Sequence, residues 1–301
     1  MFKHILVPLD GSKLAEAAIP FAVEFCRKLD AQITLLHVIE KDAPSEVHGQ
    51  RHLTNEPESC DYLGDISERY FGFCAKVEKH VHTEEVSEVA ASIVDHSGEL
   101  KPDLIILTAH GAGGLRDIIA GSIAQQVIAE GKVAVLLIKP VEDKFGEVPS
   151  FSNLLIPLDG EPAHEQSLKV AGDLAAKLTS RITLVRVVPT ITTLSGEQAA
   201  VGTLLPGTTT AYLEIAEEDA SEYLQGKIDN LRAKGLDCGA EILRGDVAQE
   251  IVTAAQRLKS DMIIMGTHGK AGLSAFWAGS VAPKIVNKTR LPILLVPVRR
   301  E

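Results

Sequence analysis

The sequence lacks long hydrophobic runs and an excess of positive charge. No apolar segment approaches the roughly 18 residues of a membrane span, and the start of the chain lacks the longer apolar stretch of a secretory signal. A net charge of -11 leaves no visible basic stripe that would follow a nucleic-acid backbone. We therefore expect a cytoplasmic protein that binds neither membranes nor nucleic acids.

Cysteine is scarce, and the signatures of common catalytic sites are missing. The four cysteines include no C-x-x-C pair, so we expect reduced thiols rather than a disulfide framework. The sequence has no Walker lysine motif, no H-E-x-x-H motif, no kinase signature and no Ser-His-Asp arrangement. These absences predict no catalytic residue and no metal site, and they indicate that any enzymatic turnover is slow.

The chain has the length of two ordinary domains, and its sequence contains an internal repeat. The run Ile5-Leu-Val-Pro-Leu-Asp-Gly11 recurs as Leu154-Leu-Ile-Pro-Leu-Asp-Gly160, so that Asp10 and Asp159 are 149 residues apart. A second pair of apolar runs recurs at the same spacing. Equal spacing over separate runs indicates two aligned copies of one unit.

Each copy alternates short, almost continuously apolar strands with amphipathic helices. This pattern predicts an α/β fold of two tandem doubly wound domains, each a mainly parallel five-stranded sheet flanked by helices. We place the first domain at residues 1–142 and the second at residues 151–301. The last strands, 133–138 and 292–297, are apolar edges that need a partner, so we expect the copies to pair through them as a pseudo-dimer. Pairing of whole chains into a homodimer stays open.

A glycine array in the second copy points to phosphate binding. Gly266 and Gly269 follow an apolar strand, and Gly279-Ser280 open a helix after nine intervening residues. Glycine permits a sharp turn with bare N–H groups, and the N-terminus of a helix attracts an anion. The alternative interpretation is two unrelated glycine turns followed by a serine cap. The place of the array in the fold has to decide between them.

Three residues of the second copy belong to one end of the predicted sheet. Asp159, Val187 and Gly266 lie at the carboxyl ends of strands, where doubly wound sheets bind their ligands. A carboxylate at this place can bond ribose hydroxyls, although Asp159 also suits a turn or a helix cap. We interpret Gly245-Asp246, after another strand, mainly as a turn and helix cap.

On these residues the chain resembles a tandem universal stress protein, with two such domains covering nearly all of it. The resemblance implies an ATP-binding regulatory protein, with magnesium as an optional companion of the nucleotide. It implies that the glycine array holds the phosphates, the aspartate holds the ribose, and backbone after the first two strands meets the base. The expected set is Pro157, Asp159, Val187, Met265, Gly266, His268, Gly269, Gly279 and Ser280.

The first copy departs from this pattern. Thr108 stands in the place of Gly266, where a β-branched side chain narrows the space near a ligand and resists a positive φ. Glu84 adds a carboxylate close to the expected phosphates, which opposes their binding. We therefore favour a structural or regulatory role for this copy over nucleotide binding. The residues that remain for such a site are Asp10, Val38, Gly111, Gly121 and Ser122.

Two other functions stay open. One is a slow magnesium-dependent ATPase or autophosphorylating enzyme, in which His268 or Lys270 faces the γ-phosphate. The other is a scaffold that binds another small ligand or a metal through the first copy, which holds eight of the ten histidines. His80 and His82 share one face of a strand, and His52 or Cys60 could join them from the long segment 41–65. This segment and a second long one, 189–210, break the regular alternation of strands and helices, and we expect them to be loose.

Overall fold

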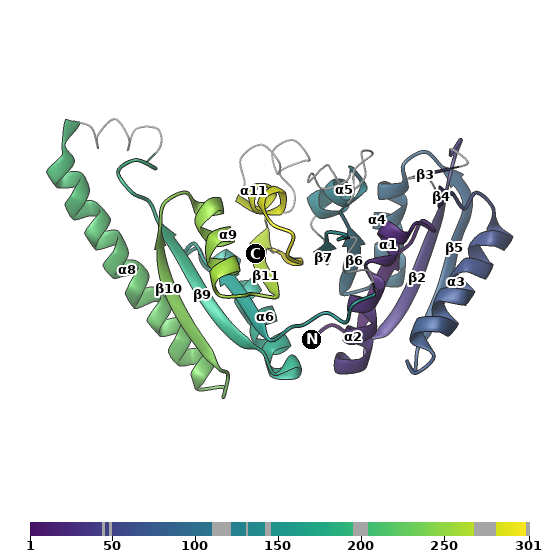
Figure 1. The fold of residues 1–301 in the computed structure, drawn as a ribbon, viewed down its shortest axis with the longest axis horizontal. Helices are drawn as coiled ribbons and strands as arrows, with labels where there is room; N and C mark the ends of the chain where they lie inside the picture. The colour runs from purple at the N-terminus through teal and green to yellow at the C-terminus, as the bar shows by residue number, and fades with distance from the viewer. Residues whose placement is uncertain are drawn as a thin grey trace. The chain divides into compact units, whose positions relative to one another are not determined.

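The chain folds as two compact units, each an α/β sheet with helices (Figure 1). The computed structural model describes residues 1–43, 46–47, 50–109, 122–130, 132–141, 146–194, 204–267 and 281–298. The first unit contains the first copy together with β12 (Ile293–Pro297). The second unit contains the rest of the described second copy up to Gly266, together with α11 (Val281–Lys288).

The sheet of the first unit has the strand order β5-β2-β1-β6-β7-β12. The first copy's own five strands pair in parallel, as predicted. β12 pairs antiparallel with β7, with Ile293 opposite Leu137, so the expected pairing between the last strands of the two copies is present. The strands are β1 (His4–Pro8), β2 (Gln32–Glu40), β5 (Val77–Val86), β6 (Leu104–Thr108) and β7 (Ala134–Ile138), and a separate two-stranded sheet is formed by β3 (Glu46–Val47) and β4 (Gln50–Arg51).

Helices cover both faces of this sheet. Along β5, the side chain of Lys79 reaches Gly64 of α3, whereas His80 and His82 meet His96 of α4. Because neighbouring side chains of a strand point to opposite faces, α3 and α4 lie on opposite faces of the sheet. The helices are α1 (Lys13–Glu16), α2 (Ile19–Leu29), α3 (Glu56–Phe71), α4 (Val89–Leu100) and α5 (Ser122–Glu130).

The second unit repeats this plan with the strand order β10-β9-β8-β11, all in parallel. Asp246 caps α9, as predicted, because its side chain accepts a hydrogen bond from the N–H of Gln249 at 2.9 Å. The strands are β8 (Asn153–Pro157), β9 (Arg181–Val188), β10 (Cys238–Arg244) and β11 (Met262–Thr267). The remaining helices are η2 (Pro162–Glu165), α6 (Gln166–Leu178), α8 (Pro206–Arg232) and α9 (Val247–Arg257).

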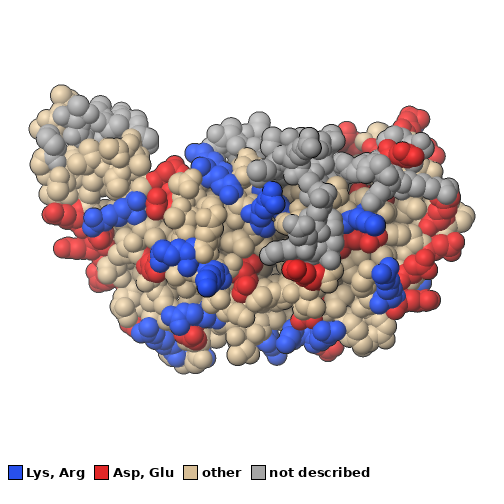
Figure 2. Space-filling model, in the orientation of Figure 1, with Lys and Arg blue, Asp and Glu red and all other residues tan. Residues whose placement is uncertain are grey.

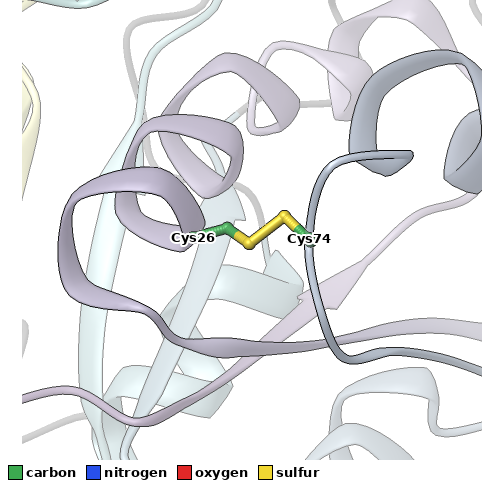
Figure 3. The surroundings of a disulfide bond; sticks show 2 residues. All are labelled: Cys26 and Cys74. Carbon is green, nitrogen blue, oxygen red and sulfur yellow. A yellow bond between two sulfur atoms is a disulfide. The ribbon is translucent and has the colours of Figure 1, made fainter.

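A disulfide in the first unit contradicts the expectation of reduced thiols. Cys26, near the end of α2, is joined to Cys74, which follows α3 (Figure 3). The expectation was wrong because it rested on local spacing, whereas the fold brings together two cysteines 48 residues apart. Cys60 and Cys238 are free thiols.

The two long segments that we expected to be loose both contain regular structure. In the second copy α8 begins at Pro206, and in the first copy the described part of 41–65 is largely ordered. It contains β3, β4 and the first part of α3, which is capped by the Asn55 side chain accepting a hydrogen bond from the N–H of Glu58. No helix among the described residues has both the length and the apolar character needed to cross a membrane. On the face drawn in Figure 2, the acidic and basic side chains shown in colour are interspersed.

Candidate functional site

The carboxyl ends of β8, β9 and β11 lie along one edge of the second unit. β8 pairs in parallel with both β9 and β11, so Asp159, Val187 and Gly266 are brought to the same edge. Their role in holding a nucleotide stays a prediction. Pro157 and Met265 belong to the same strands, whereas His268, Gly269, Gly279 and Ser280 lie outside the described residues.

Asp159 shapes the turn after β8. Its Oδ1 accepts a hydrogen bond from the N–H of Glu161 at 3.0 Å, and Gly160 between them has a φ of 92°, which favours glycine. In the first unit, Asp10 accepts the corresponding bond from the N–H of Ser12 at 2.8 Å. The aspartate is therefore a turn residue in both copies. About half of the Asp159 side chain, 52%, is nevertheless exposed, so its carboxylate can also meet a ligand.

His164 lies between Asp159 and Gly266. Its Nδ1 bonds to Oδ2 of Asp159. Its backbone packs on the glycine, because a Cβ added to Gly266 would lie 3.3 Å from both the Cα and the carbonyl oxygen of His164. Gly266 does not have a positive φ, so the expectation that its backbone conformation requires glycine is wrong. The close approach of His164 explains this glycine instead.

A cluster of aromatic and charged side chains beside this edge was not found from the sequence. The guanidinium of Arg186 and the ammonium of Lys227 lie 5.2 Å and 5.0 Å from the ring centre of Tyr223. Glu165 accepts a hydrogen bond from Tyr223 at 3.0 Å and forms an ion pair with Lys227 at 2.6 Å. Burial, assisted by Glu165, raises the pKa of Tyr223. Of these residues, only Arg186 could have been noticed in the sequence, because it occupies the repeated position at which the first copy has His37.

The first unit has a cavity of about 120 Å³ at the corresponding end of its sheet. It is mostly apolar, and Asp10 is its acidic member. Asp10 and Val38 line it, as does Thr108, whereas Gly111 and Gly121 lie outside the described residues and the side chain of Ser122 is not described. The lining residues are Pro8, Leu9, Asp10, Ala15, Leu36, Val38, Val89, Ile93, Leu107, Thr108, Ile123 and Ala124.

A buried histidine fixes the chain beside this end of the first unit. His37 is 1% exposed, and its two ring nitrogens contact the carbonyl oxygens of Leu9 at 2.7 Å and Leu53 at 3.2 Å. The side chain of Leu53 in turn lies against Gly11, where a Cβ would come within 2.8 Å of it. The long segment 41–65 is therefore held against the turn that carries Asp10.

The histidines of the first unit gather differently from the expectation. His80 and His82 share a face of β5, and His96 of α4 packs against both, with ring centres 4.8 Å and 4.9 Å apart. Burial first, and then the neighbouring His96 and His82, lower the pKa of His80. Among the described residues, no group of three or more His, Cys, Asp or Glu is arranged to hold a metal ion.

Comparison with known proteins points to one family over both halves. The model of the universal stress protein family matches residues 1–139 and again residues 150–297. A universal stress protein of Mycolicibacterium smegmatis is 24% identical over 310 aligned positions, which cover 98% of this chain and 97% of that protein. One of Methanocaldococcus jannaschii is 29% identical over 146 residues, or 48% of this chain and 82% of that protein.

A solved structure extends the likeness to the fold. The crystal structure of a universal stress protein from Archaeoglobus fulgidus matches with a TM-score of 0.62 and covers 98% of this chain and 96% of its own. The two sequences are 17% identical, so this likeness concerns the fold alone.

Proposed function

This chain belongs to the universal stress protein family, and on that premise we propose that it is a cytoplasmic regulatory protein of the stress response that binds ATP in its second half. The observation that carries the proposal is the position of Asp159. Its half-exposed carboxylate follows β8 at the edge where β9 and β11 also end, and Gly266 of the complete glycine array lies at that edge. A ligand at this edge would meet an acid and backbone N–H groups together.

The residues present at this edge suit the parts of a nucleotide. A carboxylate can accept hydrogen bonds from both hydroxyls of a ribose. Pro157 and Val187 lie on adjacent strands, β8 and β9, and can offer backbone polar groups to the edge of a base. Arg186 adds positive charge next to Gly160. The remaining glycines and Ser280 would contribute the N–H and hydroxyl donors that phosphates need.

We propose binding without rapid turnover. Hydrolysis of ATP needs an aligned water and charge neutralisation, normally by a metal ion. The carboxylate of Asp159 already accepts from Glu161 and bonds to His164, which makes it a poor holder of magnesium. If the alternative of a slow ATPase is correct, magnesium-dependent phosphate release will be measurable and will disappear in Asp159→Ala.

The cavity of the first unit supports a second candidate function. Pro8, Asp10 and Val38 are the counterparts of the residues proposed for base and ribose, and all three line this single cavity. Thr108 stands at the position of the first array glycine, so the place for phosphates is altered. We therefore propose that a nucleoside without a polyphosphate chain is the better ligand for this half.

Matched substitutions in the two halves test both proposals. Isothermal titration with ATP should give a binding signal that Gly279→Val abolishes and Gly121→Val leaves unchanged, while circular dichroism shows that both variants are folded. Titration with adenosine should depend on Asp10 more than on Asp159. Unchanged ATP affinity in the Gly279→Val protein would refute the second-half site.

A further inference from the structure

We propose that His164 is a latch on the nucleotide site of the second half. Its imidazole holds the oxygen of Asp159 that a ribose hydroxyl would take, so a nucleotide enters only when this side chain turns away. The inference rests on the proposed function and adds a means of regulating the same site.

The latch occupies the inner side of the carboxylate. Oδ1 of Asp159 is used by the turn, and Oδ2 bonds to His164. The imidazole is far less exposed than its partner, with 16% of the His164 side chain accessible against 52% for Asp159. The ring therefore lies on the protein side of the carboxylate, and the backbone that carries it packs against Gly266 of β11.

The backbone of His164 is held by hydrogen bonds that do not involve its imidazole. Its N–H donates to the carbonyl of Glu161 at 3.0 Å, and its carbonyl accepts from the hydroxyl of Ser167 at 2.8 Å. Gly266 provides the space in which this backbone packs. Opening the latch requires a change of side-chain rotamer, in which the hydrogen bond to Asp159 is lost while the backbone of η2 keeps its own hydrogen bonds.

The first half provides the natural comparison. The position 149 residues before His164 is Ala15, whose methyl group cannot reach a carboxylate. Ala15 and Asp10 line the cavity of about 120 Å³ in that half. The latch is therefore a property of the second half that the common fold does not require.

The test compares three proteins by titration and stopped-flow binding of ATP. Removal of the imidazole in His164→Ala should raise ATP affinity about tenfold, since a hydrogen bond to a charged group no longer has to be broken. The association rate should rise with it, because no side chain has to move first. His164→Gln keeps a donor for Asp159 and should restore the slower association of the native protein, which a merely structural role would not produce.

The outcomes separate the latch from the site itself. Equal affinities and association rates in the native protein and His164→Ala would overturn the latch and leave the nucleotide site standing. Weaker binding in His164→Ala would make this histidine a ligand-binding residue and would also overturn the latch. Absence of ATP binding in all three proteins would overturn the proposed function, and the latch with it.

Discussion

The two halves of this chain share their strands but use the carboxyl ends of their sheets differently. At one repeated position, the first half has His37, which is buried and bonds to the carbonyls of Leu9 and Leu53. The second half has Arg186, which is partly exposed and lies over the ring of Tyr223. One residue ties the backbone of its own unit together, and the other places a positive charge beside Gly160.

At two further repeated positions, the larger and the smaller side chain have changed places between the halves. The first half places Ala15 in the short helix α1 and Thr108 at the end of β6, whereas the second half places His164 in the short helix η2 and Gly266 near the end of β11. In the second half, the glycine makes room for the backbone of His164. The lesson is that a duplicated fold can keep its backbone and still fill the space at its strand ends with different side chains.

Removal of the disulfide should give the largest difference between the halves. Cys26 and Cys74 close a loop in the first unit over a sequence separation of 48 residues. Restriction of the unfolded chain by such a loop contributes about 4 kcal/mol in the chain-entropy model. We expect Cys26→Ser/Cys74→Ser to lose hydrogen-exchange protection in the first half, with the second half retaining its own.

The exposed free thiol of Cys60 supplies the control for that measurement. Cys60→Ser changes a cysteine in the same half and leaves the disulfide intact, so protection should match the native protein. Equal losses of protection in both halves of the double variant would show that the disulfide does not act on the first unit alone.

Truncation of His37 and of its counterpart Arg186 should give the next largest difference, in the free energy of unfolding. His37→Ala leaves the carbonyls of Leu9 and Leu53 without their buried partner, which we expect to cost about 2 to 3 kcal/mol in the free energy of unfolding. Arg186→Ala removes a cation–π contact at a partly exposed site, for which about 1 kcal/mol or less is expected.

Urea denaturation of the two variants measures this contrast. Hydrogen exchange should also show faster exchange around Leu53 in His37→Ala, because that histidine fixes the segment. If Arg186→Ala proves as costly as His37→Ala, the division between a structural and a ligand-facing residue is wrong.

The sequence was sufficient for the fold because that prediction depended on repeated patterns. The apolar strands, their parallel pairing within each copy and the pairing of β7 with β12 follow from runs that occur twice, whereas the spatial order of the strands was not predicted. The edge that carries Asp159 was likewise located from strand ends. Its contact with His164 was not, because that contact depends on a rotamer and on a turn in three dimensions.

Other features had no local signal at all. Cys26 and Cys74 are far apart in the chain, and Tyr223 lies in α8, a helix whose packing the sequence did not specify. His96 completes the histidine cluster from a separate helix, so strand periodicity could suggest only His80 and His82. Sequence patterns specify elements and edges well, whereas contacts between elements require the structure.

The smallest expected contrast is a loss of stability on mild acidification that is confined to the first half. His80 faces His82 on its own strand and His96 and Glu99 on α4, and its pKa is lowered mainly by burial and by the two other histidines. The unfolded chain, with a histidine pKa of about 6.5, therefore takes up a proton before the folded protein does. The stability that neutral His80 contributes is fully present above the unfolded pKa of about 6.5, and it is lost as the pH falls through the lower pKa that His80 has in the folded protein.

Hydrogen exchange at pH 7.5 and pH 5.5 measures this loss in each half separately. His80→Gln removes the titrating group and should reduce the difference between the two conditions, although Glu99 partly opposes the effect in the native protein. The second half contains two of the ten histidines, His164 and His268, whereas the cluster of His80, His82 and His96 lies in the first half. Acidification that weakens the second half as much as the first would therefore show that the histidine cluster is not the cause.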